Sequence, residues 1–386
     1  MQNEQLVAKL NDKRIKKRLK ALKALFLEDT VLETAYDLDR NINYVYRTVY
    51  SCFDRTPSLA VYYTKKFGMP LTAIVDYASL ASAEELIKAG KITGGIYYCG
   101  AEVAVKTADG KRIILSAVGV PHKNVKAFDD DLALYRSKRL AFTNALREKL
   151  NARFKKYSIS LPYAFWSLFG TVKTTSLEDL YVTLANKVME KFQTAPCIID
   201  FLTNNLGLEL NEEELKKLGD TSSTLYLFDL AYALKNKLLI KQPEEELNKA
   251  TDFVKLCEKY GAMSSATYKG GDLDEFLDEI KALGLNSATA EFSNDQAFMQ
   301  EFYDKCMQRG ILPIIRTLVA HPRKRLDGKF ESEELAKKYK DNALCIVGHE
   351  ISSSINQEDG MFSAKTIEQF PSLEERIKLY SRVGTK

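Results

Sequence analysis

The sequence predicts an α/β barrel that carries a helical insertion, and two observations support this fold class. Residues 41–120 alternate apolar strand segments with helices and end in a hairpin whose turn is Asp109-Gly110. The same alternation returns after residue 245, with glycines at helix ends. Such alternation is typical of parallel strands joined by crossover helices. Together the two parts predict about seven strands, which is consistent with a closed barrel.

The first part has clear helix signals. Pro57 stands at the start of a predicted helix that Gly68 ends. An apolar strand follows at residues 71–75. Beyond it, Ser82 and Glu85 have the spacing of a capping box, so we expect the next helix to begin there.

Two helical stretches lie outside the barrel pattern. Residues 4–27 have the apolar spacing of one basic amphipathic helix, which we interpret as packed on the barrel rather than docked on a membrane or nucleic acid. Residues 129–244 show helical spacing with exposed Lys and Glu. We therefore expect residues 1–128 to form the N-terminal helix and the first half of the barrel, and 129–244 a helical insertion over one end. Residues 245–386 would form the second half and the tail.

The second half is expected to contain four helices and four strands. The predicted helices are residues 246–260, 273–283, 296–309 and 332–340, and the predicted strands are residues 262–268, 287–292, 312–319 and 343–347.

Composition narrows the functional classes. The 386 residues include 56 basic and 52 acidic side chains, a near balance that argues against a nucleic-acid-binding face. The six cysteines are scattered without metal-site spacing, as in a reducing compartment. No apolar run has the length of a membrane span, and the first residues lack the apolar region of a leader peptide. We expect a soluble, cytoplasmic protein with no membrane partner.

Two motifs carry a resemblance to a known family. The segments IVDYASLASAEELIKAG (residues 74–90) and YYCGAEVAV (residues 97–105) resemble the second and third motifs of the PHP (polymerase and histidinol phosphatase) family. The tail that begins IVGHEISSSINQEDGMF resembles a longer bacterial subgroup of that family. The resemblance covers roughly residues 18–380. It implies a distorted (β/α)7 TIM-like barrel and a metal-dependent phosphoesterase.

The sequence departs from the family at its metal ligands. Tyr44 and Tyr46 stand where the family has paired histidines, and Tyr77 stands where it has the histidine of the second motif. Only Glu102 and Asp76 remain as acidic positions of the family type. Neutral tyrosine is a poor ligand for a divalent cation, so we do not expect a trinuclear site. Because residues two apart share one face of a strand, we expect Tyr44 and Tyr46 to point together into the barrel.

Barrel sites lie beyond the carboxyl ends of the strands, so the side chains at those places are the candidates. The catalytic candidates are Glu102, His321 and His349, the binding candidates are Tyr44, Tyr46, Asp76, Tyr77, His122, Arg316 and Arg323, and the metal candidates are Glu102 and Asp76. For Glu102, an inward ion pair with Arg47 or Arg316 is an alternative to metal binding.

The histidines also have two interpretations each. His349 follows an apolar segment predicted as a strand, and it is either a metal ligand or general acid, or a histidine satisfied by backbone groups. His321 and Arg323 either hold a phosphate at the barrel mouth or belong to an exposed basic loop. His122 is interpreted as a residue that supports the site rather than a ligand.

These observations lead to three functional hypotheses. The first is a catalytically impaired or inactive phosphoesterase homologue, without a cofactor, that binds a small anionic or phosphorylated ligand or a partner. The second is a phosphate-ester hydrolase with one divalent metal (Mn, Fe or Zn), held by Glu102, Asp76 and one of His321 and His349. The third is a scaffold that docks a protein partner on the helical insertion.

Overall fold

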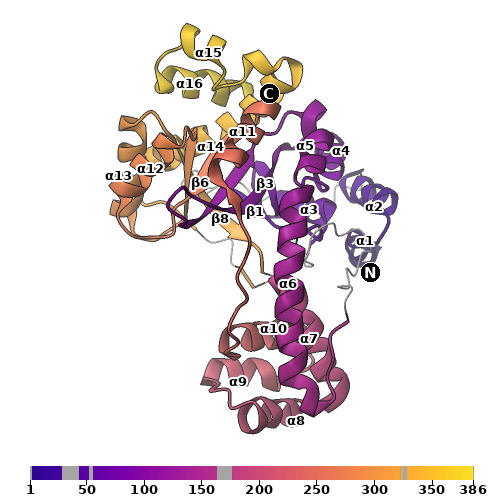
Figure 1. Ribbon diagram of the computed structural model, residues 1–386. Helices are drawn as coiled ribbons and strands as arrows, with labels where there is room; N and C mark the ends of the chain where they lie inside the picture. The colour runs from indigo at the N-terminus through magenta and orange to yellow at the C-terminus, as the bar shows by residue number, and fades with distance from the viewer. Residues whose placement is uncertain are drawn as a thin grey trace.

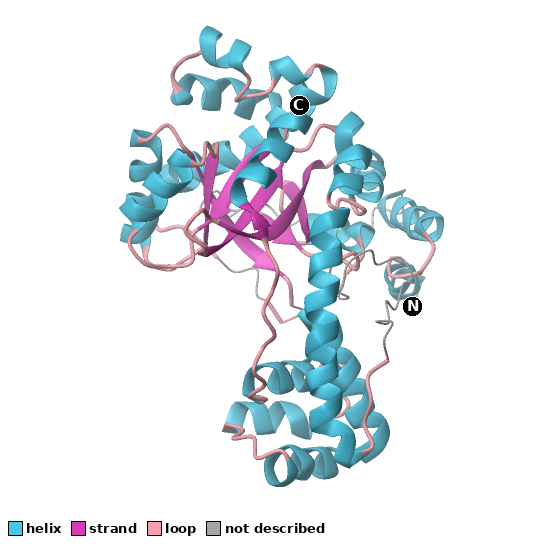
Figure 2. Ribbon diagram, in the orientation of Figure 1, coloured by secondary structure: helices cyan, strands magenta, loops and turns pink. Residues whose placement is uncertain are grey.

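A computed structural model describes residues 2–27, 43–51, 55–162, 176–321, 323–324 and 328–385. Its centre is a seven-stranded barrel surrounded by helices, and an all-helical lobe lies beyond one end of the barrel (Figure 1, Figure 2). Within the described part of the chain, no helix combines the length and the apolar character needed to cross a bilayer.

The strands close into a mixed barrel. They are β1 (Tyr44–Tyr46), β2 (Leu71–Tyr77), β3 (Ile96–Lys106), β4 (Arg112–Val118), β6 (Met263–Thr267), β7 (Ser287–Glu291) and β8 (Leu312–Val319), in the spatial order β2-β1-β8-β7-β6-β4-β3, and β3 pairs with β2 to close the ring. The short β5 (Asn248–Lys249) adds to the edge of β3. All neighbours are parallel except β4, which is antiparallel to β3 and β6. The predicted α/β barrel is confirmed.

The pairing register decides which side chains enter the barrel. Arg316 of β8 contacts Glu102 inside the barrel, and Leu318 shares this inward face because it lies two residues further along the strand. Val45 of β1 pairs with Leu318, so Val45 also faces inward. Tyr44 and Tyr46 therefore lie on the outer face, in the apolar cluster that packs under α3 (Pro57–Lys66) and α4 (Ala83–Thr93). The expectation that they point inward is wrong. Alternation shows that two side chains share a face, but it does not show which face is enclosed.

Helices cover the outside of the barrel. Those of the second half are α11 (Ala250–Tyr260), α12 (Leu273–Ala282), α13 (Gln296–Gln308), α14 (Glu333–Ile355), α15 (Ala364–Gln369) and α16 (Leu373–Val383). The predicted strand at residues 343–347 is wrong, because these residues belong to α14, a helix of 23 residues. Their side chains pack with the first residues of β2 and β8, so α14 closes the amino end of the barrel. A continuously buried helix segment has the same apolar run as a buried strand.

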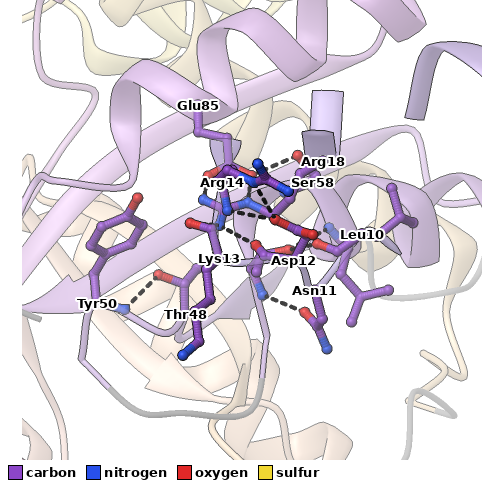
Figure 3. A network of polar contacts seen from close by, with 12 residues as sticks. Leu10, Asn11, Asp12, Lys13, Arg14, Arg18, Thr48, Tyr50, Ser58 and Glu85 are labelled. Atoms are coloured by element: carbon purple, nitrogen blue, oxygen red, sulfur yellow. Dashed lines mark hydrogen bonds and ion pairs between the residues drawn. The ribbon is translucent and has the colours of Figure 1, made fainter. Parts of the chain in front are cut away.

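The N-terminal region forms two helices, α1 (Gln2–Lys9) and α2 (Ile15–Leu27), where the sequence predicted one. Arg18 of α2 is buried and donates to Glu85 of α4 (Nε to Oε1, 2.8 Å), and Ser58 Oγ donates to the same oxygen at 2.6 Å (Figure 3). The predicted capping box is wrong, because Glu85 is used by this network and Ser82 makes no side-chain cap. The ion pair fixes α2 against the first two barrel helices.

The remaining helices lead into the lobe. They are α5 (Val125–Asp131), α6 (Ala133–Phe154), α7 (Leu177–Phe192), α8 (Ala195–Asp200), α9 (Glu212–Gly219) and α10 (Tyr226–Lys237). The helix α6 runs along the barrel and continues into the lobe (Figure 1). Its Tyr135 packs in the cluster around the barrel, whereas Leu146, Leu150 and Phe154 belong to a separate apolar cluster with α7 and α10.

Candidate functional site

Charged side chains meet inside the barrel at the carboxyl ends of its parallel strands. Glu102 of β3 accepts a hydrogen bond from Arg316 Nη1 of β8 (2.7 Å) and forms an ion pair with Arg47, directly after β1. Arg316 Nε also donates to Glu291 of β7 at 3.0 Å. The backbone N–H of Leu318 donates to the other oxygen of Glu291 at 3.1 Å. Four strands and strand ends therefore contribute to one buried ionic network.

The network holds Glu102 ionised. Burial by itself raises the pKa of Glu102, but the charges of Arg316 and Arg47 outweigh it and lower the pKa to about 2. The same contacts raise the pKa of Arg316 against the opposing effect of its burial. The ion pair expected from the sequence is present, and it involves both arginines.

Several buried donors of this region lack a partner among the described residues. They are Nη1 of Arg47, Nη2 of Arg316 and the hydroxyl of Thr267, which lies on the inward face of β6. A buried donor without a partner costs about 1–3 kcal/mol, so groups of this kind in a native structure call for an explanation. Two are guanidinium N–H groups, which are suited to carboxylate or phosphate oxygens.

Tyr77 lies next to this network, at the inward end of β2, where it is in register with Glu102. The guanidinium groups of Arg47 and Arg139 lie 5.9 Å and 5.1 Å from the centre of its ring. Arg139 comes from α6 and donates to Glu245 at 2.9 Å. A residue of the helix that enters the lobe therefore reaches the barrel mouth.

The remaining metal candidate lies elsewhere. Asp76 is on the outer face of β2, where it accepts from the backbone N–H of Thr48 (2.7 Å), the hydroxyl of Thr48 (2.7 Å) and the hydroxyl of Ser51 (2.6 Å). Its oxygens hold the loop after β1 and do not join Glu102.

These donor sets do not fit a divalent metal. Both oxygens of Glu102 already contact guanidinium groups, whose positive charge opposes a nearby cation. Over the described ranges, no three His, Cys, Asp or Glu side chains are grouped closely enough to hold a metal ion. The guanidinium N–H groups without a partner in the described structure are suited to anionic oxygens rather than to a cation.

His321 and Arg323 follow β8 and face the lobe instead of the Glu102 network. Arg323 donates from Nε and Nη2 to the two carboxylate oxygens of Asp229 on α10, at 2.6 and 2.5 Å. The ring of His321 lies 5.5 Å from that of Tyr232 and 6.4 Å from that of Phe228, both on α10.

His122 and His349 lie at the opposite end of the barrel from Glu102, because β4 runs antiparallel and α14 covers the amino end. His122 Nε2 is 2.9 Å from Glu350 Oε1. His349 Nε2 is 2.9 Å from the carbonyl of Gly261, and its Nδ1 accepts from the backbone N–H of Met361 at 3.0 Å. Burial lowers the pKa of His349 to about 4. The expected position of His349 at the mouth is wrong, since it depended on the strand at residues 343–347.

The sequence analysis therefore identified part of this constellation. Glu102, Tyr77 and Arg316 were candidates, and the structure brings them together with Arg47. Thr267 and Arg139 were missed. Thr267 could have been found from its place at the end of a predicted strand, but Arg139 lies within a helix far from any strand end, and only the fold brings it to Tyr77.

Comparisons with known proteins extend this description. No protein-family model and no curated protein matches the sequence. Among solved structures, the chain is similar to an amidohydrolase from Chromobacterium violaceum with bound sulfate and no metal, at 14% identity and a TM-score of 0.52, over 77% of this chain and 96% of that one. It is also similar to a candidate metal-dependent phosphoesterase from Bifidobacterium adolescentis, at 14% identity and a TM-score of 0.49, over 78% and 96%. At this identity the likeness to the Chromobacterium violaceum structure shows the fold alone, a closed α/β barrel.

Proposed function

We propose that this protein is a divergent PHP-type barrel that binds a small anion, such as phosphate or a phosphate ester, at the mouth of its barrel without a divalent metal. Arg47 and Arg316 would supply the charge-assisted donors, and Thr267 a neutral one. The proposal makes the protein an impaired or inactive phosphoesterase homologue with a binding function.

One observation carries the proposal. Arg47 and Arg316 each use one nitrogen on Glu102 and each retain a buried nitrogen without a partner in the described structure. Glu102 thus orients the two guanidinium groups before any ligand arrives. A receptor whose donors are already oriented loses less side-chain entropy on binding. Satisfying these donors would contribute about 1.5–3 kcal/mol for each hydrogen bond to a charged group.

The surrounding charge supports the same chemistry. The mouth holds more cationic than anionic groups, with Arg47, Arg112, Arg139, Arg316 and Lys269 against Glu102, Glu245 and Glu291. An excess of positive charge at a partly enclosed site raises the local concentration of anions. The Chromobacterium violaceum protein was solved with sulfate and without metal, which provides a precedent for an oxyanion in a metal-free protein of this fold.

Calorimetric titration with inorganic phosphate, in the presence of a chelator, tests the proposal. We expect saturable binding that is unchanged when Mn²⁺ replaces the chelator. Arg47→Lys keeps a positive charge near Glu102 but removes the unpaired nitrogen, so we expect binding to weaken by about 10-fold or more, in line with the loss of one charge-assisted hydrogen bond.

A matched pair of variants separates binding from folding. Thr267→Val removes a buried hydroxyl without a partner in the described structure, so it should weaken phosphate binding without lowering stability. Thr143→Val, which removes the bond from a buried threonine on α6 to the carbonyl of Arg139, serves as the control for binding. Stoichiometric metal, together with a phosphatase activity that Glu102→Gln abolishes, would refute the proposal and establish the single-metal hydrolase.

A further inference from the structure

A cavity lies between the barrel and the helical lobe, away from the Glu102 network. It has a volume of about 420 Å³, and its wall comes from α9, α10 and the segment after β8. Cavities of this size are typical of small-molecule sites. The residues that the argument uses are Leu218, Tyr232, His321, Arg323 and Lys324.

The hydrogen bonding of His321 defines its tautomer. The backbone N–H of Arg323 donates to His321 Nδ1 at 3.1 Å, so Nδ1 carries no proton. The neutral ring must then carry its proton on Nε2, which is buried and has no partner in the described part of the chain. Burial lowers the pKa of His321, and the charges of Arg323, Lys217 and Lys235 lower it further against Asp229. The ring therefore stays neutral, and charges of both signs surround it.

The cations of the wall differ in their availability. Arg323 is held by Asp229 in two hydrogen bonds, and Lys217 pairs with Glu213 at 2.6 Å. Lys324 is exposed and makes no ion pair with any described residue. One available ammonium and one neutral N–H match the two oxygens of a carboxylate. A dianion would require a second available cation.

The carboxylates of the wall are already paired with cations: Glu213 with Lys217, Glu214 with Lys237 and Asp229 with Arg323. The apolar part of the wall is centred on Tyr232. The ring of Tyr232 is 54% exposed and lies edge-on to His321, with Leu218 and Ala233 beside it in the lining. An exposed aromatic ring in a concave site is suited to a flat apolar ligand.

We propose that this cavity binds a small organic monocarboxylate with an apolar body, through Lys324 and His321 Nε2, with the hydrocarbon against Tyr232. This site is independent of the phosphate site at the mouth. Because its wall comes from both parts of the molecule, a bound carboxylate contacts the helical lobe and the barrel at once.

Calorimetric titration with benzoate tests this proposal on the full chain, and benzyl alcohol serves as the uncharged analogue. We expect benzoate to bind at least 10-fold more tightly than benzyl alcohol. Lys324→Met and His321→Phe should each weaken benzoate binding by about 10-fold, whereas Lys126→Met on the exposed side of α5 should leave it unchanged. Lys324 is exposed, so its substitution should leave the melting temperature unchanged and the fold intact.

Hydrogen exchange localises the site. Benzoate should slow exchange in residues 211–233 and at the amides of 321, 323 and 324, and it should do so equally in Thr267→Val, which alters only the mouth. Equal binding of benzyl alcohol, an unchanged affinity in Lys324→Met, or protection confined to the barrel mouth would each overturn the proposal. A protein that fails to bind phosphate but binds benzoate in this way would refute the proposed function and leave this site standing.

Discussion

Arg316 joins two carboxylates from different strands inside the barrel, donating to Glu102 at 2.7 Å and to Glu291 at 3.0 Å. The guanidinium thus spans from β8 to both β3 and β7. Arg47 binds the other oxygen of Glu102, so the ionic network joins β3, β7, β8 and the segment after β1.

Removal of the charge of Glu102 should destabilise the protein in a pH-dependent way. Since the folded protein lowers the pKa of Glu102 to about 2, its ion pairs stabilise the fold fully above pH 4.5 and lose their effect as the pH falls towards 2. We expect Glu102→Gln to lower the free energy of unfolding by about 3 kcal/mol at pH 7, and by much less at pH 3. Urea unfolding at both pH values measures this difference. A difference that is the same at both would contradict the assigned pairing.

Asp179, in the helical lobe, should make stability depend on pH in the direction opposite to that of Glu102. This carboxylate is buried in α7 beside Ser176, and burial raises its pKa to about 7 despite the hydrogen bonds from Ser176. The folded state therefore favours the protonated form, and stability should fall as the pH rises from about 4 to 7. Asp179→Asn should stabilise the protein by up to roughly 4 kcal/mol at pH 8 and have little effect at pH 4. Thermal melting at the two pH values, with the exposed Asp200→Asn as control, measures this difference.

The outward orientation of Tyr46 predicts that its hydroxyl takes no part in ligand binding. Tyr46→Phe should leave the affinity for phosphate unchanged and alter stability by no more than about 1.5 kcal/mol, because it removes one hydroxyl under α3. Calorimetry on the variant checks this. Weaker phosphate binding would show that the tyrosine face contributes to the site.

The ion pair between Arg18 and Glu85 predicts strong destabilisation when one partner is removed. Arg18→Met leaves Glu85 buried with only the Ser58 donors, which should cost about 3–5 kcal/mol. The exposed Lys20→Met on the same helix should change stability by no more than about 0.5 kcal/mol. Urea midpoints of the two variants compare them directly, and equal midpoints would show that α2 is not held by this pair.

The packing of α14 against α16 leaves no room for a side chain at Gly348. A Cβ built on Gly348 would lie 2.0 Å from the carbonyl oxygen of Tyr380, a backbone atom that cannot yield without moving α16. Gly348→Ala should therefore destabilise the protein by about 1–3 kcal/mol or more. Gly219, where an added Cβ would meet no atom within 4 Å, offers the matched control Gly219→Ala. Melting temperatures that fall equally in both variants would contradict the observed contact.

Much of the barrel could be predicted because its signals are local. Apolar strands, the Asp109-Gly110 turn and Gly261 at the end of α11 specify their own elements. Residues 343–347 were wrongly predicted as a strand, because a continuous run of buried apolar side chains occurs both in buried strands and in enclosed helices. The break between α1 and α2 was also missed, because the apolar spacing of Ile15, Leu19, Leu22 and Phe26, which lies within α2, was extended to residue 4.

The site was harder to predict because it depends on register. The pairing of Val45 with Leu318 decides that Arg47 points inward and that Tyr44 does not, and this pairing joins segments more than 270 residues apart. The contact of Arg139 with Tyr77 is equally remote from local sequence.

The helix α6 has a mechanical consequence. Its 22 residues span about 33 Å without interruption, and its two ends are anchored in different apolar clusters. A continuous helix held at both ends connects the position of the lobe to that of the barrel. A small tilt of the lobe would then move Arg139 relative to the ring of Tyr77, and this contact would link the two proposed ligand sites.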